Sequence, residues 1–166
     1  MTMTLKTSTP RAVLAAGVLL LSLTAFAQGG GPFAPLAGQW TGDGSINMTS
    51  GAKEKIRCRA SYDVLEDGKN LQLNLRCAGD SYNFDLRGGA KANGGTISGS
   101  WSESTYNASG NLTGRVVSDK VDVTAKSASF SVNIQLTTRG DKQSVVIKSQ
   151  GENTAIAGAT INLRRG

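Results

Sequence analysis

The side chains able to do chemistry are few in this 166-residue sequence, which has two cysteines and no histidine. Without histidine the serines lack their usual general base, and a metal ion lacks its commonest nitrogen ligand. The acidic residues fall mostly in expected turns or on expected wet faces, where a carboxyl group lacks the burial that makes a general acid; they include Asp63, Glu66, Asp67, Asp80, Asp85 and Glu103. The sequence therefore predicts no enzyme, no metal site and no cofactor.

The first residues have the pattern of a signal peptide. Lys6 and Arg11 precede an apolar run over residues 12–23, and Ala25-Phe26-Ala27 has the form of a cleavage site. We expect cleavage between Ala27 and Gln28. The apolar run is shorter than the roughly 20 residues that span a bilayer, so no membrane anchor is expected. Export predicts a periplasmic or secreted protein of a Gram-negative bacterium.

The two cysteines are expected to form one disulfide, because an exported protein matures in an oxidising compartment. Apolar and polar residues alternate over residues 56–64 and again over 71–77, on either side of Asp67-Gly68. Asp-Gly between two alternating runs is a strong hairpin signal. Centring the turn on this pair places Cys58 directly opposite Cys77. The hydrophobic pattern and the disulfide thus predict the same register.

The elements that position these residues are expected to be strands throughout. Residues 28–35 are rich in glycine and proline and predict a flexible N-terminal segment. Over residues 36–166 the pattern has period two, and turn residues recur about every ten positions. We expect one all-β domain, an antiparallel up-and-down meander of about 8–10 strands. Closure into a barrel removes exposed sheet edges, so a barrel is favoured.

Aromatic residues at inward positions are the candidates for a ligand wall. Trp101 follows the bare Gly99 by two residues, and Tyr62 and Phe84 share its inward parity. Plain core packing is the alternative role for all three. Glycines at inward positions predict either bulges that bend the sheet or a cavity, with bulges favoured; these positions are Gly42, Gly44, Gly99 and Gly114.

Three arginines, Arg57, Arg59 and Arg76, lie on the outward face of the predicted hairpin. The register places Arg59 opposite Arg76, a pairing of like charges that destabilises two strands. Asp63, Asp85 or a bound anion could compensate, and a solvated face is the plainer interpretation. Removal of Lys6 and Arg11 with the signal peptide would lower the formal charge from +6 to +4. The remaining charge is spread thinly along the chain, which does not indicate nucleic-acid binding.

The opening of the domain, Leu36-Ala37-Gly38-Gln39-Trp40, resembles the Gly-x-Trp start of calycin barrels: lipocalins, the avidin family and small bacterial metalloprotease inhibitors. In those barrels the tryptophan closes one end and a basic residue of the last strand packs over it. The resemblance assigns these roles to Trp40 and Arg164, with Arg165 adjacent.

The resemblance implies non-catalytic binding of a small apolar or amphipathic ligand. A periplasmic protease inhibitor is the alternative, with a secreted protease as partner and residues 28–35 entering its cleft. An envelope structural protein is a third alternative. The sequence leaves the ligand and the oligomeric state open.

Overall fold

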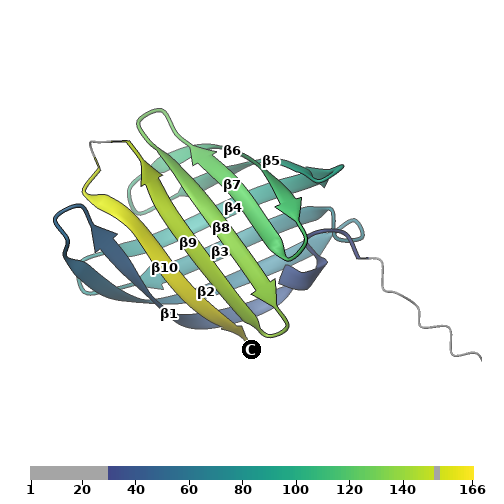
Figure 1. Ribbon diagram of the computed structural model, residues 1–166, viewed down its shortest axis with the longest axis horizontal. Coiled ribbons are helices and arrows are strands. Elements are labelled where there is room, and N and C mark those ends of the chain that lie inside the picture. Colours follow the sequence, from purple (N-terminus) through teal and green to yellow (C-terminus); the bar gives the residue numbers. More distant parts are fainter. Residues whose placement is uncertain (1–29, 152–153) are drawn as a thin grey trace, which may run out of the picture.

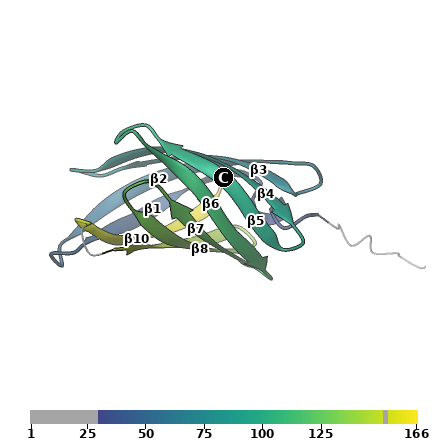
Figure 2. The same cartoon turned by 90° about the horizontal axis from the view of Figure 1, so that it is seen from above.

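A computed structural model describes residues 30–151 and 154–166, which form ten strands and one short 3-10 helix. Each strand pairs antiparallel with its sequence neighbours, and β1 also pairs with β10, so the sheet closes into a barrel (Figures 1 and 2). The predicted all-β meander and its closure are confirmed. No helix among these residues has the length and apolar character needed to cross a membrane.

In chain order the elements are η1 (Ala34–Leu36), β1 (Gly38–Met48), β2 (Lys53–Leu65), β3 (Asn70–Ala78), β4 (Asn83–Asn93), β5 (Thr96–Glu103), β6 (Ala108–Val117), β7 (Lys120–Lys126), β8 (Ser131–Arg139), β9 (Lys142–Gln150) and β10 (Ile156–Arg165).

The β2–β3 hairpin has the register that the alternating pattern predicted. Cys58 pairs with Cys77 and Val64 with Leu71 across a turn centred on Asp67 and Gly68. The two cysteines form the expected disulfide, with Cα atoms 4.1 Å apart. Both sulfur-bearing side chains are buried on the inner wall of the barrel. The bond indicates that the protein matures in an oxidising environment.

The inward glycines do not form the bulges that we expected. The described strand ladders run without a shift through Gly42, Gly44, Gly99 and Gly114, and the one register shift lies at Asn47/Met48. A Cβ built on Gly99 would lie 2.0 Å from the carbonyl oxygen of Gly89 in the next strand. Glycine is required there because two backbones approach more closely than any side chain allows.

Successive turns of the meander alternate between two ends of the barrel. The β2–β3, β4–β5, β6–β7 and β8–β9 turns share one end with η1, which we call the plugged end. The other end carries the β1–β2, β3–β4, β5–β6, β7–β8 and β9–β10 turns, and we call it the open end. Figure 1 shows η1 beside the first of these groups and the β1–β2 hairpin at the opposite side.

Residues 30–36 dock onto the plugged end, although we expected the segment 28–35 to be flexible. The Gly31 amide donates to the Asp67 carbonyl at 2.5 Å, and the Phe33 amide donates to the Gly68 carbonyl at 3.0 Å. Phe33 is 1% exposed and Leu36 is 3% exposed. Burying an aromatic and a leucine side chain stabilises the docked segment by several times the thermal energy, which glycine and proline content does not reveal.

Trp40 closes the plugged end, as the Gly-x-Trp resemblance implied. Its side chain is fully buried, and its indole N–H donates to the Leu36 carbonyl at 2.7 Å. The arginine over the ring is Arg165, with its guanidinium carbon 4.5 Å from the ring centroid, and not Arg164. Arg164 points the other way and lies 3.9 Å from Asp141. The correction follows from strand alternation, because Arg165 pairs directly with Trp40.

Candidate ligand-binding site

The interior of the barrel is filled at the plugged end. Toward the open end Ile46, Ile56 and Cys77 of β1–β3 are also buried, whereas much of the remaining inner wall is only partly covered. Near the plug, inward side chains such as Tyr62, Ala92 and Ile97 are almost fully buried. Farther along the strands, inward apolar side chains are only partly buried; they include Leu73, Leu75, Phe84, Leu112, Ile134 and Ile147. Each of these lies on a strand that is paired on both sides, so solvent reaches the side chain from inside the barrel.

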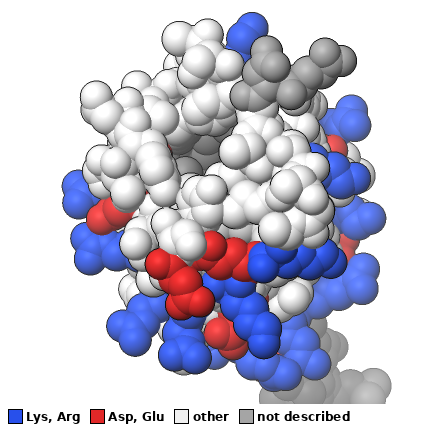
Figure 3. Space-filling view, turned by 90° about the vertical axis from the view of Figure 1, so that its left-hand side faces the viewer, with Lys and Arg blue, Asp and Glu red and all other residues white. Residues whose placement is uncertain are grey.

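Figure 3 looks into the open end and shows the hollow directly. The surface that borders most of the opening is uncharged, and the charged side chains lie mainly on the outer wall, with acidic and basic atoms reaching the lower edge of the opening in this view. An apolar concave surface that is open to solvent is the usual form of a small-molecule site. We therefore take the open half of the interior as the candidate site.

Gly88 supplies independent evidence of empty space inside the wall. It faces inward on β4, between its cross-strand partners Leu73 and Trp101. A Cβ built on Gly88 would meet only the Ser100 carbonyl oxygen, at 3.7 Å. An inward position in a filled core would place several atoms around that Cβ. The inner surface beside Trp101 is therefore unfilled.

Trp101 has the most distinctive polar group of the site. Its side chain is 8% exposed and packs against the Phe130 ring, with centroids 5.8 Å apart. Both of its cross-strand partners, Gly88 and Gly110, lack side chains. The indole N–H is buried and has no hydrogen-bond acceptor, the one such side-chain group in the described part of the chain. Buried donors normally have a partner, so this donor marks the site.

Aromatic rings continue from Phe84 toward the rim of the open end. Phe84 stacks on Tyr82 with centroids 6.5 Å apart and lies 5.7 Å from Tyr106. Tyr106 is 53% exposed at the β5–β6 turn. The alternating pattern predicted inward positions for both Phe84 and Phe130. It does not mark Tyr106, because Tyr106 belongs to a turn. The inward position of Gly88 could have been predicted, because it lies two strand alternations after Phe84 on β4 and therefore faces the same side.

Tyr62 lies apart from Trp101 and Phe84, at the plugged end. Its hydroxyl donates to Gln143 Oε1 at 2.7 Å, and Gln143 Nε2 donates to Thr138 Oγ1 at 3.2 Å. All three side chains are buried. Burial raises the pKa of Tyr62, and the Gln143 hydrogen bond only partly opposes that rise. Tyr62 ties β2 to β9 across the barrel and is a structural residue rather than a ligand wall.

Glu103 is buried, although we expected it in a turn or on a wet face. Its Oε1 accepts from the amides of Asp85 and Thr105, at 2.8 and 3.1 Å, and its Oε2 accepts from the Tyr106 amide at 2.7 Å. Burial raises its pKa, and the three amide donors outweigh that effect and leave the pKa below the ordinary value. A carboxylate held in this way fixes the β5–β6 turn and is a poor proton donor.

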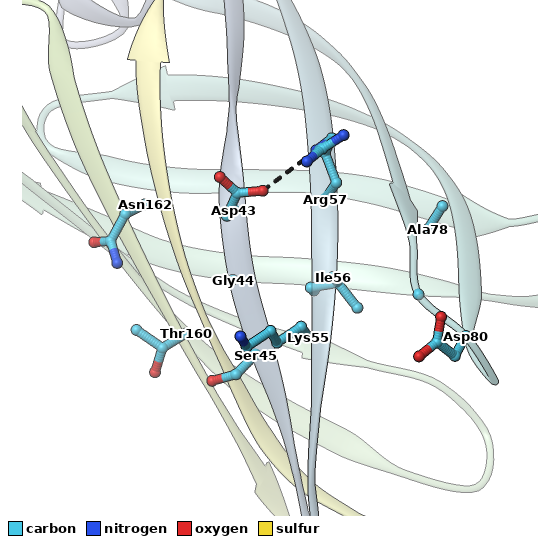
Figure 4. A pocket seen from close by; sticks show the side chains of 11 residues that line it. Asp43, Gly44, Ser45, Lys55, Ile56, Arg57, Ala78, Asp80, Thr160 and Asn162 are labelled. Carbon is cyan, nitrogen blue, oxygen red and sulfur yellow. Dashed lines mark hydrogen bonds and ion pairs between the residues drawn. The ribbon is translucent and has the colours of Figure 1, made fainter.

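Arg57 lines a groove on the outer face of β10, β1 and β2 (Figure 4). Its Nε lies 3.4 Å from Asp43 Oδ1, and both side chains are about four-fifths exposed, at 81% and 78%. An ion pair in this setting contributes little to stability. The groove lies on the outer wall of the barrel, and most of the residues that line it have polar or charged side chains.

The register places Arg59 opposite Arg76, as the sequence predicted, and Asp85 supplies the expected compensation. Arg76 Nε lies 3.0 Å from Asp85 Oδ2. Arg59 shares an outer groove with Arg76 and Arg87 and forms no ion pair within the described ranges. The three predicted arginines therefore lie in two outer grooves, and two of them are paired with carboxylates.

No cluster of histidine, cysteine, aspartate or glutamate that could hold a metal ion occurs among residues 30–151 and 154–166. The predicted cleavage site between Ala27 and Gln28 lies outside the described residues.

Together the fold and the site define a class: a small, closed, ten-stranded antiparallel barrel with one end filled by described residues. The solved structure of Rv2717c from M. tuberculosis is similar, with a TM-score of 0.66 and 13% identity over 80% of this chain and 94% of that one. CPES, an S-type phycobiliprotein lyase from Guillardia theta, has a TM-score of 0.54 and 9% identity, over 81% and 90% of the two chains. No protein-family model and no curated protein matches the sequence. At these identities the similarity shows the fold alone.

Proposed function

We propose that this protein binds a small apolar or amphipathic molecule in the open half of its barrel, without catalysing a reaction. The observation that carries the proposal is the partly exposed apolar lining above a fully packed plug. Exposed apolar surface inside a barrel has no structural benefit, whereas a ligand that covers it is stabilised by about 25 cal/mol for each Å² removed from water. The calycin resemblance and the similar barrels support the same type of site.

The polar groups near the site support binding rather than catalysis. Glu103 is the buried carboxylate closest in sequence to Trp101, and three backbone amides occupy its oxygens. A general acid needs a free carboxyl group with a raised pKa, which is the opposite of what Glu103 has. With no histidine in the sequence, the usual base is also missing.

We further propose that the protein acts outside the cytoplasm, in the periplasm or after secretion. The Cys58–Cys77 disulfide supports an oxidising location. The signal-like pattern at residues 1–27 supports export on sequence grounds.

The protease-inhibitor alternative has weaker support. It needs a free N-terminal segment to enter a protease cleft, whereas Phe33 of that segment is buried in the barrel and its amide is bonded to Gly68. An envelope structural role predicts no hollow interior. Neither alternative accounts for the unfilled space beside Gly88.

Native mass spectrometry of the protein purified from its own host tests the proposal. We expect an additional mass on the folded protein that is lost on denaturation and that returns when the extracted compound is added back. A ligand-free spectrum, together with no thermal protection by a panel of lipids and apolar cofactors, would contradict it.

A further inference from the structure

We infer that the ligand of the open half is an uncharged molecule with a carbonyl or ether oxygen, and that this oxygen accepts a hydrogen bond from the Trp101 indole N–H. This inference rests on the proposed function and specifies the chemistry of its ligand. Its basis is that Trp101, whose indole N–H has no acceptor, pairs across the strands with Gly88, where the inner surface is unfilled.

The unpartnered donor indicates an acceptor in the ligand. A buried N–H without a partner costs about 1–3 kcal/mol relative to one that is satisfied. Trp101 is inward-facing and more than nine-tenths buried, and Gly88 leaves the wall on one side of it open, whereas on the Gly110 side the backbone of Lys126 fills the space. A ligand that enters beside Trp101 and brings an oxygen to the indole removes that cost.

The charges of the open half disfavour an anionic ligand. In the described strands, the inward carboxylates toward the open end are those of Glu54 and Glu103, which accept hydrogen bonds from backbone amides of Ser81, Tyr82, Asp85 and Tyr106. Among the described strand positions that face inward, the one with a lysine or arginine is Arg165, which lies over Trp40 at the plugged end, so the open half has no inward cation there. A carboxylate or phosphate would therefore lose its hydration near two negative charges without gaining a cationic partner.

A cationic ligand is disfavoured by the same donor. An N–H points its positive end toward the ligand, and the oxygens of Glu103 that could attract a cation are already engaged by three amides. The chemistry that fits both features is a neutral apolar or aromatic compound with one accessible acceptor oxygen.

The chain contains two tryptophans, and this allows a direct test by NMR of the indole N–H groups. Trp40 donates to Leu36 at 2.7 Å and is an internal control, whereas Trp101 is unpartnered. The full mature chain, labelled with ¹⁵N, would be titrated with three matched probes: naphthalene, 2-acetylnaphthalene and 2-naphthoate. All three probes share the naphthalene ring, which we expect to pack against Phe130 and the ring of Trp101.

We expect 2-acetylnaphthalene to move the Trp101 indole proton downfield, to leave Trp40 unmoved, and to bind about tenfold more tightly than 2-naphthoate. Naphthalene should bind without the downfield shift. W101F keeps an aromatic ring and removes the donor, so the affinity for the ketone should fall about tenfold while that for naphthalene changes by less than about twofold.

The outcomes separate this inference from the proposed function. If 2-acetylnaphthalene and naphthalene both bind but shift Trp101 alike, or if W101F weakens both equally, the barrel binds apolar molecules and the acceptor inference is wrong. If 2-naphthoate binds most tightly, the inference of an uncharged ligand is wrong. If none of the three binds at millimolar concentration, the proposed function fails, and this inference fails with it.

Discussion

The two tryptophans lie in two contrasting halves of one barrel. Around Trp40 every polar group has a partner: the indole bonds to Leu36, and Arg165 lies over the ring and donates to the carbonyls of Pro35 and Ala37. Around Trp101 the neighbouring strand positions are glycines and the indole N–H has no acceptor. Trp40 is a core residue whose indole N–H is hydrogen-bonded, whereas Trp101 lines the inner wall and its indole N–H has no acceptor.

This contrast teaches how a small barrel combines stability with a cavity. Phe33, Leu36 and Trp40 fill the plugged end, and Tyr62 with Gln143 joins its walls. Toward the open end the Cys58–Cys77 disulfide and the buried Ile46 and Ile56 stabilise β1–β3, and the rest of the inner wall is more loosely packed. Local stability is expected to differ between the ends, since it follows buried contacts and satisfied hydrogen bonds.

The largest expected difference between the halves is in the two tryptophan-to-alanine variants. W40A removes a fully buried ring, a hydrogen bond and the stacked Arg165, and should lower the free energy of unfolding by about 4 kcal/mol. W101A removes a ring beside unfilled space and no hydrogen bond, so its loss should be about 2 kcal/mol. Urea unfolding measures both, and equal losses would contradict the contrast.

The next effect concerns the buried network of the plugged end. Y62F leaves Gln143 Oε1 without its donor in a buried site, which should lower the free energy of unfolding by about 2 kcal/mol. The conservative V64A change on the same strand provides a reference for loss of packing alone, because Val64 is only partly buried.

Tyr62 also predicts a loss of stability at alkaline pH. The folded protein holds the neutral phenol, so the pKa of Tyr62 is higher in the folded state than in the unfolded chain. Its contribution is therefore complete below about pH 10 and declines as the pH rises above that value. The free energy of unfolding between pH 9 and 11 should fall more steeply in the native sequence than in Y62F, and parallel curves would argue against the burial of this phenol.

At the open end, Glu103 should have a smaller effect. E103Q replaces a charged acceptor of three amides by a weaker one and should lower the free energy of unfolding by about 1 kcal/mol. Because the pKa of Glu103 is lowered on folding, its contribution is present above about pH 4.5 and is lost as the pH falls below that value. E66Q, in the exposed β2–β3 turn, is the control.

The smallest expected effect is an increase in the free energy of unfolding. G88A places a methyl group into open space at an ordinary strand position and should raise the free energy of unfolding by about 0.5 kcal/mol, because alanine restricts the unfolded chain. G99A is its matched opposite, since that Cβ would lie 2.0 Å from the Gly89 carbonyl oxygen. Thermal melts of the two variants should move in opposite directions.

Sequence alternation predicted much of this architecture because each residue of a strand has only two faces. It gave the Cys58–Cys77 register and the inward side of Trp101 and Phe84. Applied to the last strand, it also favours Arg165 over Arg164 as the partner of Trp40, since Leu163 faces inward.

Alternation predicts which face of a strand a residue lies on, but it does not predict the position of that residue along the barrel axis. The predictions were incomplete for this reason. Tyr62 and Trp101 have the same parity and lie in different halves, which depends on the stagger of all ten strands. Phe33 docks from a segment with no period, and Glu103 accepts amides from β4 and from the β5–β6 turn, contacts that the alternation of one strand does not reveal. These features arise from tertiary packing.

The most direct test of the account uses two adjacent glycines on β4. Gly88 faces the hollow and Gly89 faces outward beside Gln72, and a Cβ at either position meets nothing closer than 3.5 Å. G88L should fill the cavity and weaken binding of the neutral fluorophore 6-propionyl-2-(dimethylamino)naphthalene at least about tenfold. G89L, with the same added volume on the outer wall, should bind it as the native sequence does. Equal binding by G88L and the native protein would show that the open half of the barrel is not the site.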